Sequence, residues 1–129
     1  MQIEHVAIWT QDLERLKGFY EMYFQAQAGP KYSNPNKGFS SYFLNFGPGA
    51  RLEIMQMSGI AERQADPLGQ FSGLTHLALT VGSPEAVDAL TGRLANAGFR
   101  VVGQPRWTGD GYYESVILDP DGNRVEIVI

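Results

Sequence analysis

The residues of this chain whose types and spacing could do chemistry are two histidines and two glutamates: His5, Glu53, His76 and Glu126. Histidine and glutamate are 48 positions apart in the first half (53 − 5) and 50 in the second (126 − 76). Imidazole nitrogens and carboxylate oxygens are the donors that borderline divalent ions prefer, and two of each suit Zn, Ni, Co, Mn or Fe. The four residues therefore predict a site for one divalent metal ion that still leaves room for a substrate.

The two pairs occupy equivalent places in an internal repeat. Residues 3–8 (IEHVAI) match residues 74–79 (LTHLAL), and residues 51–54 (RLEI) match residues 124–127 (RVEI). The offset between the halves is 71 at the histidines and 73 at the glutamates, so a loop between them must absorb two residues. A repeat of about half the chain predicts two similar modules.

Each half is expected to run strand, helix and then several strands. Short β-branched and apolar runs predict opening strands at 3–9 and 74–81. Thr10 or Asp12 can cap the first helix, and Ser83 caps the second, which Gly98 ends in a left-handed conformation. The remaining strand-like segments are 39–46, 51–57, 99–102, 113–118 and 123–129.

These elements predict an α+β fold of two tandem modules, each with one strand, one helix and then several strands, on a mixed sheet curved so that the four residues face one space. The modules cover about 1–58 and 74–129, and residues 59–73 connect them within one domain of 129 residues. Neither half alone is long enough to bury a core. Residues 30–38, rich in Asn, Pro, Lys and Tyr, are a candidate lid loop.

Strand side chains alternate between the two faces of a sheet, so the apolar face of each strand can be buried while the histidine and glutamate face lines a cleft. Apolar residues on that second face are candidate substrate contacts, with plain core as the alternative: Trp9, Met55 and Met57. Tyr113 is a further candidate, with an ordinary strand start as the alternative. For the glutamates, the alternative to metal binding is an ion pair with Arg51 or Arg124.

The composition narrows the class of protein. Hydrophobic residues make up 43% and charged residues 19%, which is typical of a globular chain. A net charge of −4 without a Lys/Arg run argues against a nucleic-acid partner. The absence of cysteine excludes disulfides and thiol chemistry. The sequence has neither a signal-peptide pattern nor an apolar run of membrane-spanning length, so we expect a cytoplasmic protein without membrane contacts.

The opening strand with His5, the segment GLTHLALTV at 73–81, the closing DPDGNRVEI at 119–127 and Glu53 together resemble the vicinal oxygen chelate superfamily. Glyoxalase I, bleomycin-resistance proteins and extradiol dioxygenases belong to that superfamily, and the resemblance covers essentially the whole chain. It implies two βαβββ modules with the metal in a cleft, and a homodimer with sites near the interface.

Position by position, the four residues match the metal ligands of glyoxalase I. The resemblance implies a lyase or isomerase that removes a proton next to a carbonyl group held by the metal, with Glu126 as base and Glu53 as its partner. Glyoxalase I usually has an arginine at the place of Trp9 and an asparagine near Met57, both of which hold glutathione. Apolar residues at both places favour a smaller or more apolar substrate.

Two other functions fit the same fold. A ligand-sequestering protein of the bleomycin-resistance type would need no metal, and the acidic balance with Trp9 would suit a flat, cationic guest. An iron dioxygenase would need only the equivalents of His5, His76 and Glu126, so the presence of Glu53 argues against it.

Overall fold

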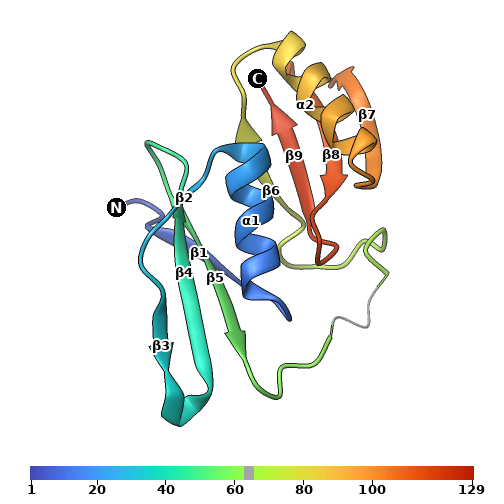
Figure 1. The fold of residues 1–129 in the computed structure, drawn as a ribbon. Coiled ribbons are helices and arrows are strands. Elements are labelled where there is room, and N and C mark those ends of the chain that lie inside the picture. The colour runs from blue at the N-terminus through green and yellow to red at the C-terminus, as the bar shows by residue number, and fades with distance from the viewer. Residues whose placement is uncertain (63–65) are drawn as a thin grey trace. The chain divides into compact units, whose positions relative to one another are not determined.

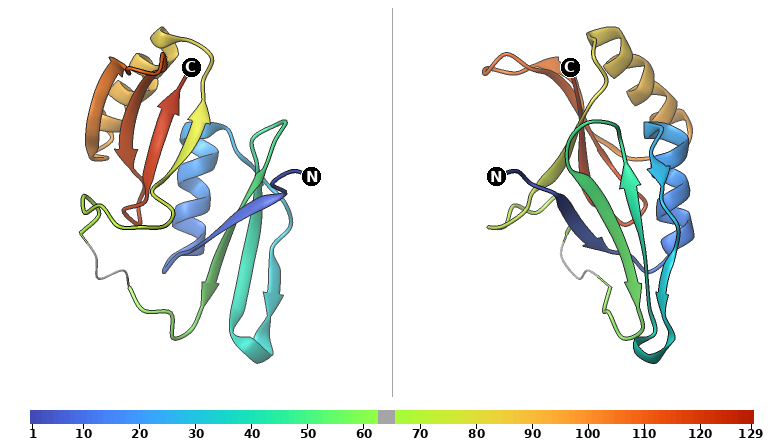
Figure 2. Two further views of the ribbon diagram at one scale, coloured as in Figure 1. Left: turned by 180° about the vertical axis from the view of Figure 1, so that it is seen from behind. Right: turned by 90° about the vertical axis from the view of Figure 1, so that its left-hand side faces the viewer.

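The computed structural model describes residues 1–62 and 66–129. The chain divides into two compact units, Met1–Arg63 and Gln64–Ile129, which we call the first and second modules. Each module packs one α-helix on its own mixed sheet (Figure 1; Figure 2). The predicted α+β class with two modules is therefore confirmed, and the division of the chain lies inside the predicted connection at 59–73.

The first module holds, in chain order, β1 (His5–Trp9), α1 (Leu13–Phe24), β2 (Gln27–Ala28), β3 (Tyr32–Asn34), the 3-10 helix η1 (Pro35–Lys37), β4 (Phe39–Asn45) and β5 (Arg51–Met57). The order in its sheet is β1-β5-β4-β2, and β3 also pairs with β4. β1 runs parallel to β5, whereas the other pairs are antiparallel. The predicted loop at 30–38 is wrong over 32–37, because β3 finds backbone partners on β4 and Pro35 starts η1.

The second module holds β6 (His76–Thr80), α2 (Pro84–Asn96), β7 (Val101–Trp107), β8 (Tyr113–Leu118) and β9 (Arg124–Val128). The order in its sheet is β6-β9-β8-β7, with β6 parallel to β9. Gly98 has a φ of 89°, as predicted for the residue that ends the helix. The strand predicted at 99–102 begins later and is longer, because two register shifts let β7 continue along β8.

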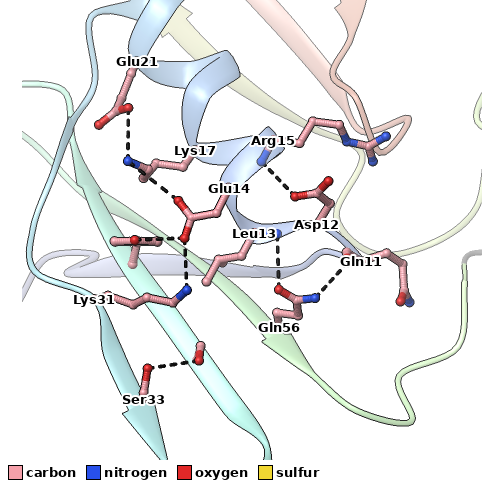
Figure 3. Close-up of polar contacts among 12 residues, drawn as sticks. Gln11, Asp12, Leu13, Glu14, Arg15, Lys17, Glu21, Lys31, Ser33 and Gln56 are labelled. Carbon is pink, nitrogen blue, oxygen red and sulfur yellow. Dashed lines mark hydrogen bonds and ion pairs between the residues drawn. The ribbon is translucent and has the colours of Figure 1, made fainter.

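Hydrogen bonds connect the start of α1 to β5, the strand that carries Glu53 (Figure 3). The Asp12 side chain caps the helix by accepting from the backbone N–H of Arg15 at 3.0 Å. Gln56 of β5 accepts from the N–H of Leu13 at 3.3 Å and donates to the carbonyl of Gln11 at 2.9 Å. Of the two predicted caps, Asp12 is therefore the one used, and the side chain of Gln56 fixes the helix start against the sheet.

Each module buries the apolar face of its strands under its helix. The buried apolar residues of the first module are Leu13, Leu16, Phe19, Tyr20, Ala26, Leu44, Leu52 and Ile54, and those of the second are Val87, Leu94, Ile117, Leu118, Val125 and Ile127. In the second core, Thr91 of α2 donates to the carbonyl of Val87 and lies 2.6 Å from the hydroxyl of Ser115 on β8. Because one face of each sheet is buried under its helix, side chains on the opposite face can take part in a functional site.

The internal repeat persists in the folded modules. The α-helices begin at Leu13 and Pro84, an offset of 71, whereas β4 and β8 end at Asn45 and Leu118, an offset of 73. The two additional residues of the second module therefore lie between the start of its helix and the end of β8, a stretch in which it has the long strand β7 in place of β2, β3 and η1. Among the described residues, no helix is long and apolar enough to cross a membrane.

Candidate metal centre

The parallel strand pairs bring each histidine beside its glutamate. Ala7 is the register partner of Glu53 across β1 and β5, and His5 lies two residues before Ala7 on the same face. Side chains that differ by two positions point to the same side of a strand. The predicted alternation therefore places His5 and Glu53 on one face, opposite the face that packs against α1.

The second module repeats this arrangement. Ala78 is the register partner of Glu126 across β6 and β9, and His76 lies two residues before Ala78. The distance from Nε2 of His76 to Oε2 of Glu126 is 3.2 Å, and the corresponding distance from His5 to Glu53 is 3.8 Å. Each module thus offers one imidazole nitrogen and one carboxylate oxygen side by side.

The histidine and the glutamate of each pair differ in how much of the side chain is exposed to solvent. The histidine side chains are 40% and 39% exposed, whereas the side chains of Glu53 and Glu126 are only 16% and 20% exposed. Burial raises the pKa of the Glu126 carboxyl above its ordinary value, and the nearby His76 opposes part of that rise. A half-buried carboxylate beside a reachable imidazole is well suited to meet a cation from solution, because the cation replaces the solvation that burial removes.

Arg51 and Arg124, which lie near the two glutamates in the sequence, interact with other groups. Arg51 forms an ion pair with Glu4, and its guanidinium lies over the ring of Phe43 at 4.2 Å. Arg124 donates to the carbonyls of Pro67 at 3.1 Å and Gly69 at 3.4 Å. The alternative in which these arginines neutralise Glu53 and Glu126 is therefore not the arrangement found.

Both histidines have a partner on the second ring nitrogen, which sequence reasoning missed. Nδ1 of His5 bonds to the Glu4 carboxylate, and Nδ1 of His76 lies 3.0 Å from the Thr75 hydroxyl. Glu4 and Thr75 each precede their histidine and share its offset of 71. A polar residue at the same place in both copies of the repeat was the signal that could have found them.

An ion pair also lies on the Glu126 face of the second sheet. Val116 is the register partner of Glu126, and Glu114 lies two residues before Val116 on the same face. Arg106 of β7 donates to Glu114 at 3.2 Å. Charged side chains therefore continue from Glu126 toward β7, and neither member of this pair was among the predicted site residues.

In the first module, by contrast, large apolar and aromatic side chains follow Glu53 on the same face, with the small polar residue Ser41 as the register partner of Met55. Trp9 meets the ring of Phe39 edge to face at 6.2 Å, and Tyr32 meets Phe39 at 6.0 Å. Met55 and Met57 stand on this face by their registers, Trp9 with Met55 and Phe39 with Met57. The three predicted substrate contacts of this module therefore share the face of His5 and Glu53, and Phe39 and Tyr32 extend the group.

Tyr113 is not brought to the His76 and Glu126 pair. It shares its strand face with Ser115, which is buried against α2, and its hydroxyl donates to Asp88 of α2 at 2.9 Å. That hydrogen bond raises the pKa of the Tyr113 phenol, with burial adding to the rise. The side chain thus faces the helix rather than the face that carries Glu126.

Each module offers one imidazole and one carboxylate, and these donor types are chemically suited to a divalent ion. Among the described residues, no group of three or more His, Cys, Asp or Glu side chains is gathered closely enough to hold a metal ion. Each pair has one nitrogen and one oxygen donor, with the other imidazole nitrogen occupied. Imidazole nitrogen and carboxylate oxygen are donors that suit Zn, Ni, Co, Mn or Fe.

Two modules of this kind, each with a helix packed on a mixed sheet whose first and last strands are parallel, are the architecture of the vicinal oxygen chelate fold. The sequence model of the Glyoxalase/Bleomycin resistance protein/Dioxygenase superfamily matches residues 2–127, and the chain belongs to this superfamily. Relatives span its length: the uncharacterized protein YqjT of Bacillus subtilis (strain 168) is 29% identical over 131 residues, which cover 98% of this chain and 97% of YqjT.

Solved structures agree on the fold. The glyoxalase family protein from Enterococcus faecalis has a TM-score of 0.78 and 26% identity, over 99% of this chain and 97% of that one. Glyoxalase I from Zea mays has a TM-score of 0.80 and 22% identity over 98% of this chain. The chain spans only 44% of the length of the maize protein, so this second likeness is one of fold.

Proposed function

We propose that the protein is a metal-dependent lyase or isomerase of the glyoxalase type, which removes a proton next to a carbonyl group of a small substrate. The proposed ligands of one divalent ion are His5, Glu53, His76 and Glu126. The observation that carries the proposal is the repetition of one geometry, a histidine Nε2 facing a glutamate Oε2, at equivalent places in the two modules.

The chemistry follows from the two carboxylates. A bound divalent ion supplies Lewis acidity toward the substrate carbonyl. Glu126 is the proposed base because its position matches that of the base in glyoxalase I. Glu53 is its proposed partner, the second carboxylate within reach of the reacting carbon.

The aromatic face of the first module is the proposed place for the rest of the substrate. Trp9, Met55 and Met57 follow the His5 and Glu53 pair along the strands, at about 7 Å for every two residues. All three residues are uncharged, as are Phe39 and Tyr32, whose rings lie beside Trp9 and each other. The substrate is therefore proposed to be compact at its reacting end and uncharged and apolar beyond it.

The experiment is a metal titration of chelator-stripped protein with Ni²⁺, Zn²⁺ and Mn²⁺, read by calorimetry together with proton release. About one ion per pair of modules is expected, with binding lost in His5→Ala and in His76→Ala. Loss in only one of these variants would contradict a shared site. In the metal-loaded protein, Glu126→Gln should lower turnover of α-hydroxycarbonyl or thioester substrates by roughly 10²- to 10⁴-fold without loss of fold; full activity would contradict the role of Glu126.

The ligand-sequestering alternative is favoured by the exposed ring of Trp9, which is 41% exposed on an apolar face. It predicts binding of flat, cationic aromatic compounds that is unchanged by a chelator. The metal titration separates the two functions, because a sequestering protein of that type would bind none of the three ions. An iron dioxygenase would instead consume oxygen with a catechol and tolerate Glu53→Gln.

The proposed assembly is a homodimer with sites near its interface. Light scattering during size-exclusion chromatography would measure its mass. A monomer that binds one ion per chain would contradict the proposed dimer, and the four proposed metal ligands would stand.

A further inference from the structure

The Glu4 carboxylate joins two side chains of the first module. It bonds to Nδ1 of His5 and to the guanidinium of Arg51. A carboxylate only accepts hydrogen bonds, so the neutral imidazole of His5 must carry its proton on Nδ1. The lone pair then lies on Nε2, the nitrogen 3.8 Å from Glu53.

We propose that Glu4 is a positioning residue that holds His5 in the tautomer and orientation required of a metal ligand. The inference rests on the proposed metal site. Metal-bound histidines commonly donate their other N–H to a carboxylate, which fixes the ring and makes the ligating nitrogen more basic. Glu4 stands in that relation to His5.

The surroundings of Glu4 hold it in place. The backbone N–H of Arg51 donates to the Glu4 carbonyl at 3.0 Å, so main chain and side chain of Arg51 both engage Glu4. Phe43 lies under the Arg51 guanidinium and meets the His5 ring edge to face at 5.3 Å. The imidazole of His5 is therefore bounded by a carboxylate at each nitrogen and by an aromatic ring.

The second module lacks this charged support. Thr75, at the place equivalent to Glu4, offers a hydroxyl 3.0 Å from Nδ1 of His76. A hydroxyl can donate or accept, so Thr75 is compatible with either tautomer. Arg124, equivalent to Arg51, is engaged with the carbonyls of Pro67 and Gly69. Removal of Glu4 should therefore weaken metal binding more than removal of the Thr75 hydroxyl.

The first measurement is the affinity of the full chain for Zn²⁺ and Ni²⁺ in Glu4→Leu, with Thr75→Val for comparison. Glu14→Leu is the matched control, because the Glu14 and Glu4 side chains are both 57% exposed and both carry a salt bridge. We expect a loss of about 10- to 100-fold for Glu4→Leu, a smaller loss for Thr75→Val and none for Glu14→Leu. Glu4→Gln keeps an acceptor and should restore part of the affinity.

The second measurement needs no metal. Long-range ¹H–¹⁵N NMR at about pH 8, above the ordinary histidine pKa of about 6.5, identifies the protonated ring nitrogen. We expect the Nδ1–H tautomer of His5 in the wild type and in Glu4→Gln, and its loss in Glu4→Leu. An Nε2–H tautomer in the wild type, or equal metal affinity in wild type and Glu4→Leu, would overturn the role of Glu4. Absence of metal binding by the wild type would instead overturn the proposed function on which that role depends.

Discussion

Ala7 lies directly opposite Glu53 in the parallel pairing of β1 and β5, and Ala78 lies opposite Glu126 in the same relation. Both alanines stand on the face of the histidine and glutamate, directly beside the glutamate and two residues after the histidine. Alanine is disfavoured in strands, so its recurrence at this register has another reason. A methyl group leaves open the space in which the two side chains converge.

Enlarging either alanine should therefore block metal binding. In Ala7→Leu and Ala78→Leu, the larger side chain would fill the space between imidazole and carboxylate, and metal affinity should fall by at least tenfold. The fold should persist, because both positions are exposed. Thr80→Leu, at an exposed position farther along β6, is the control. Unchanged affinity in the alanine variants would mean that the two side chains converge elsewhere.

Trp9 should contribute to binding of an apolar substrate. Trp9→Ala removes the indole that packs on Phe39, and the lost contact area should cost about 1 to 2 kcal/mol, or roughly 5- to 30-fold in kcat/KM. Trp107, 63% exposed in the second module, provides the control substitution Trp107→Ala. In a Trp107→Phe background, ligand binding should change the fluorescence of Trp9. A charged substrate turned over equally well by Trp9→Ala would contradict the apolar assignment.

The hydroxyl pair in the second core should behave as a unit. Thr91→Val leaves the buried Ser115 hydroxyl without its partner at 2.6 Å, and should lower the free energy of unfolding by about 1 to 3 kcal/mol. Thr91→Val combined with Ser115→Ala should cost less than the sum of the single changes, because neither buried hydroxyl remains. Urea unfolding of all four proteins measures the coupling; strict additivity would show that the two hydroxyls act independently.

Glu14 should give a small acid-dependent contribution to stability. A hydrogen bond from Lys31 at 3.0 Å, with another from Tyr42, holds the pKa of the Glu14 carboxyl below its ordinary value of 4.5. A pKa lowered by folding stabilises the protein above about pH 4.5 and loses that contribution as the pH falls through the folded value. The side chain is 57% exposed, so the contribution should stay below about 1 kcal/mol.

The measurement for Glu14 is urea unfolding of wild type and Glu14→Gln at about pH 7 and about pH 3. The difference in unfolding free energy should appear at the higher pH and vanish at the lower one. Lys31→Met should have little further effect in the Glu14→Gln background. A difference that grows toward low pH would have the wrong sign for this ion pair.

The shared face of each histidine and glutamate could be predicted from the sequence because strand side chains alternate with a period of two. His5 and Glu53 share a face with their partners only if each strand keeps its alternation, and the apolar residues Leu52 and Ile54 enforce it by being buried. The same reasoning placed Trp9, Met55 and Met57. It could not place Tyr113, because its face depends on the helix that covers β8.

The structure of the segment that follows α1 could not be predicted from its local sequence. Gln25 ends α1 with a φ of 56°, a left-handed conformation that a non-glycine residue rarely adopts and that no sequence rule indicates. β2 and β3 form through backbone bonds to β4, which are tertiary contacts. Polar composition predicted a loop there, whereas pairing with a neighbour decided otherwise.

The sequence by itself determined the class of fold, the two modules and the residues of the candidate metal centre, since repetition and alternation are properties of the chain. Only the tertiary structure decided which atoms meet. Nδ1 of His5 on Glu4, Arg51 on Glu4 rather than Glu53, and Tyr113 on Asp88 all depend on side-chain directions set by packing. Hydrogen bonds select among nearby partners by distance and angle, and those are fixed only when the strands and helices have come together.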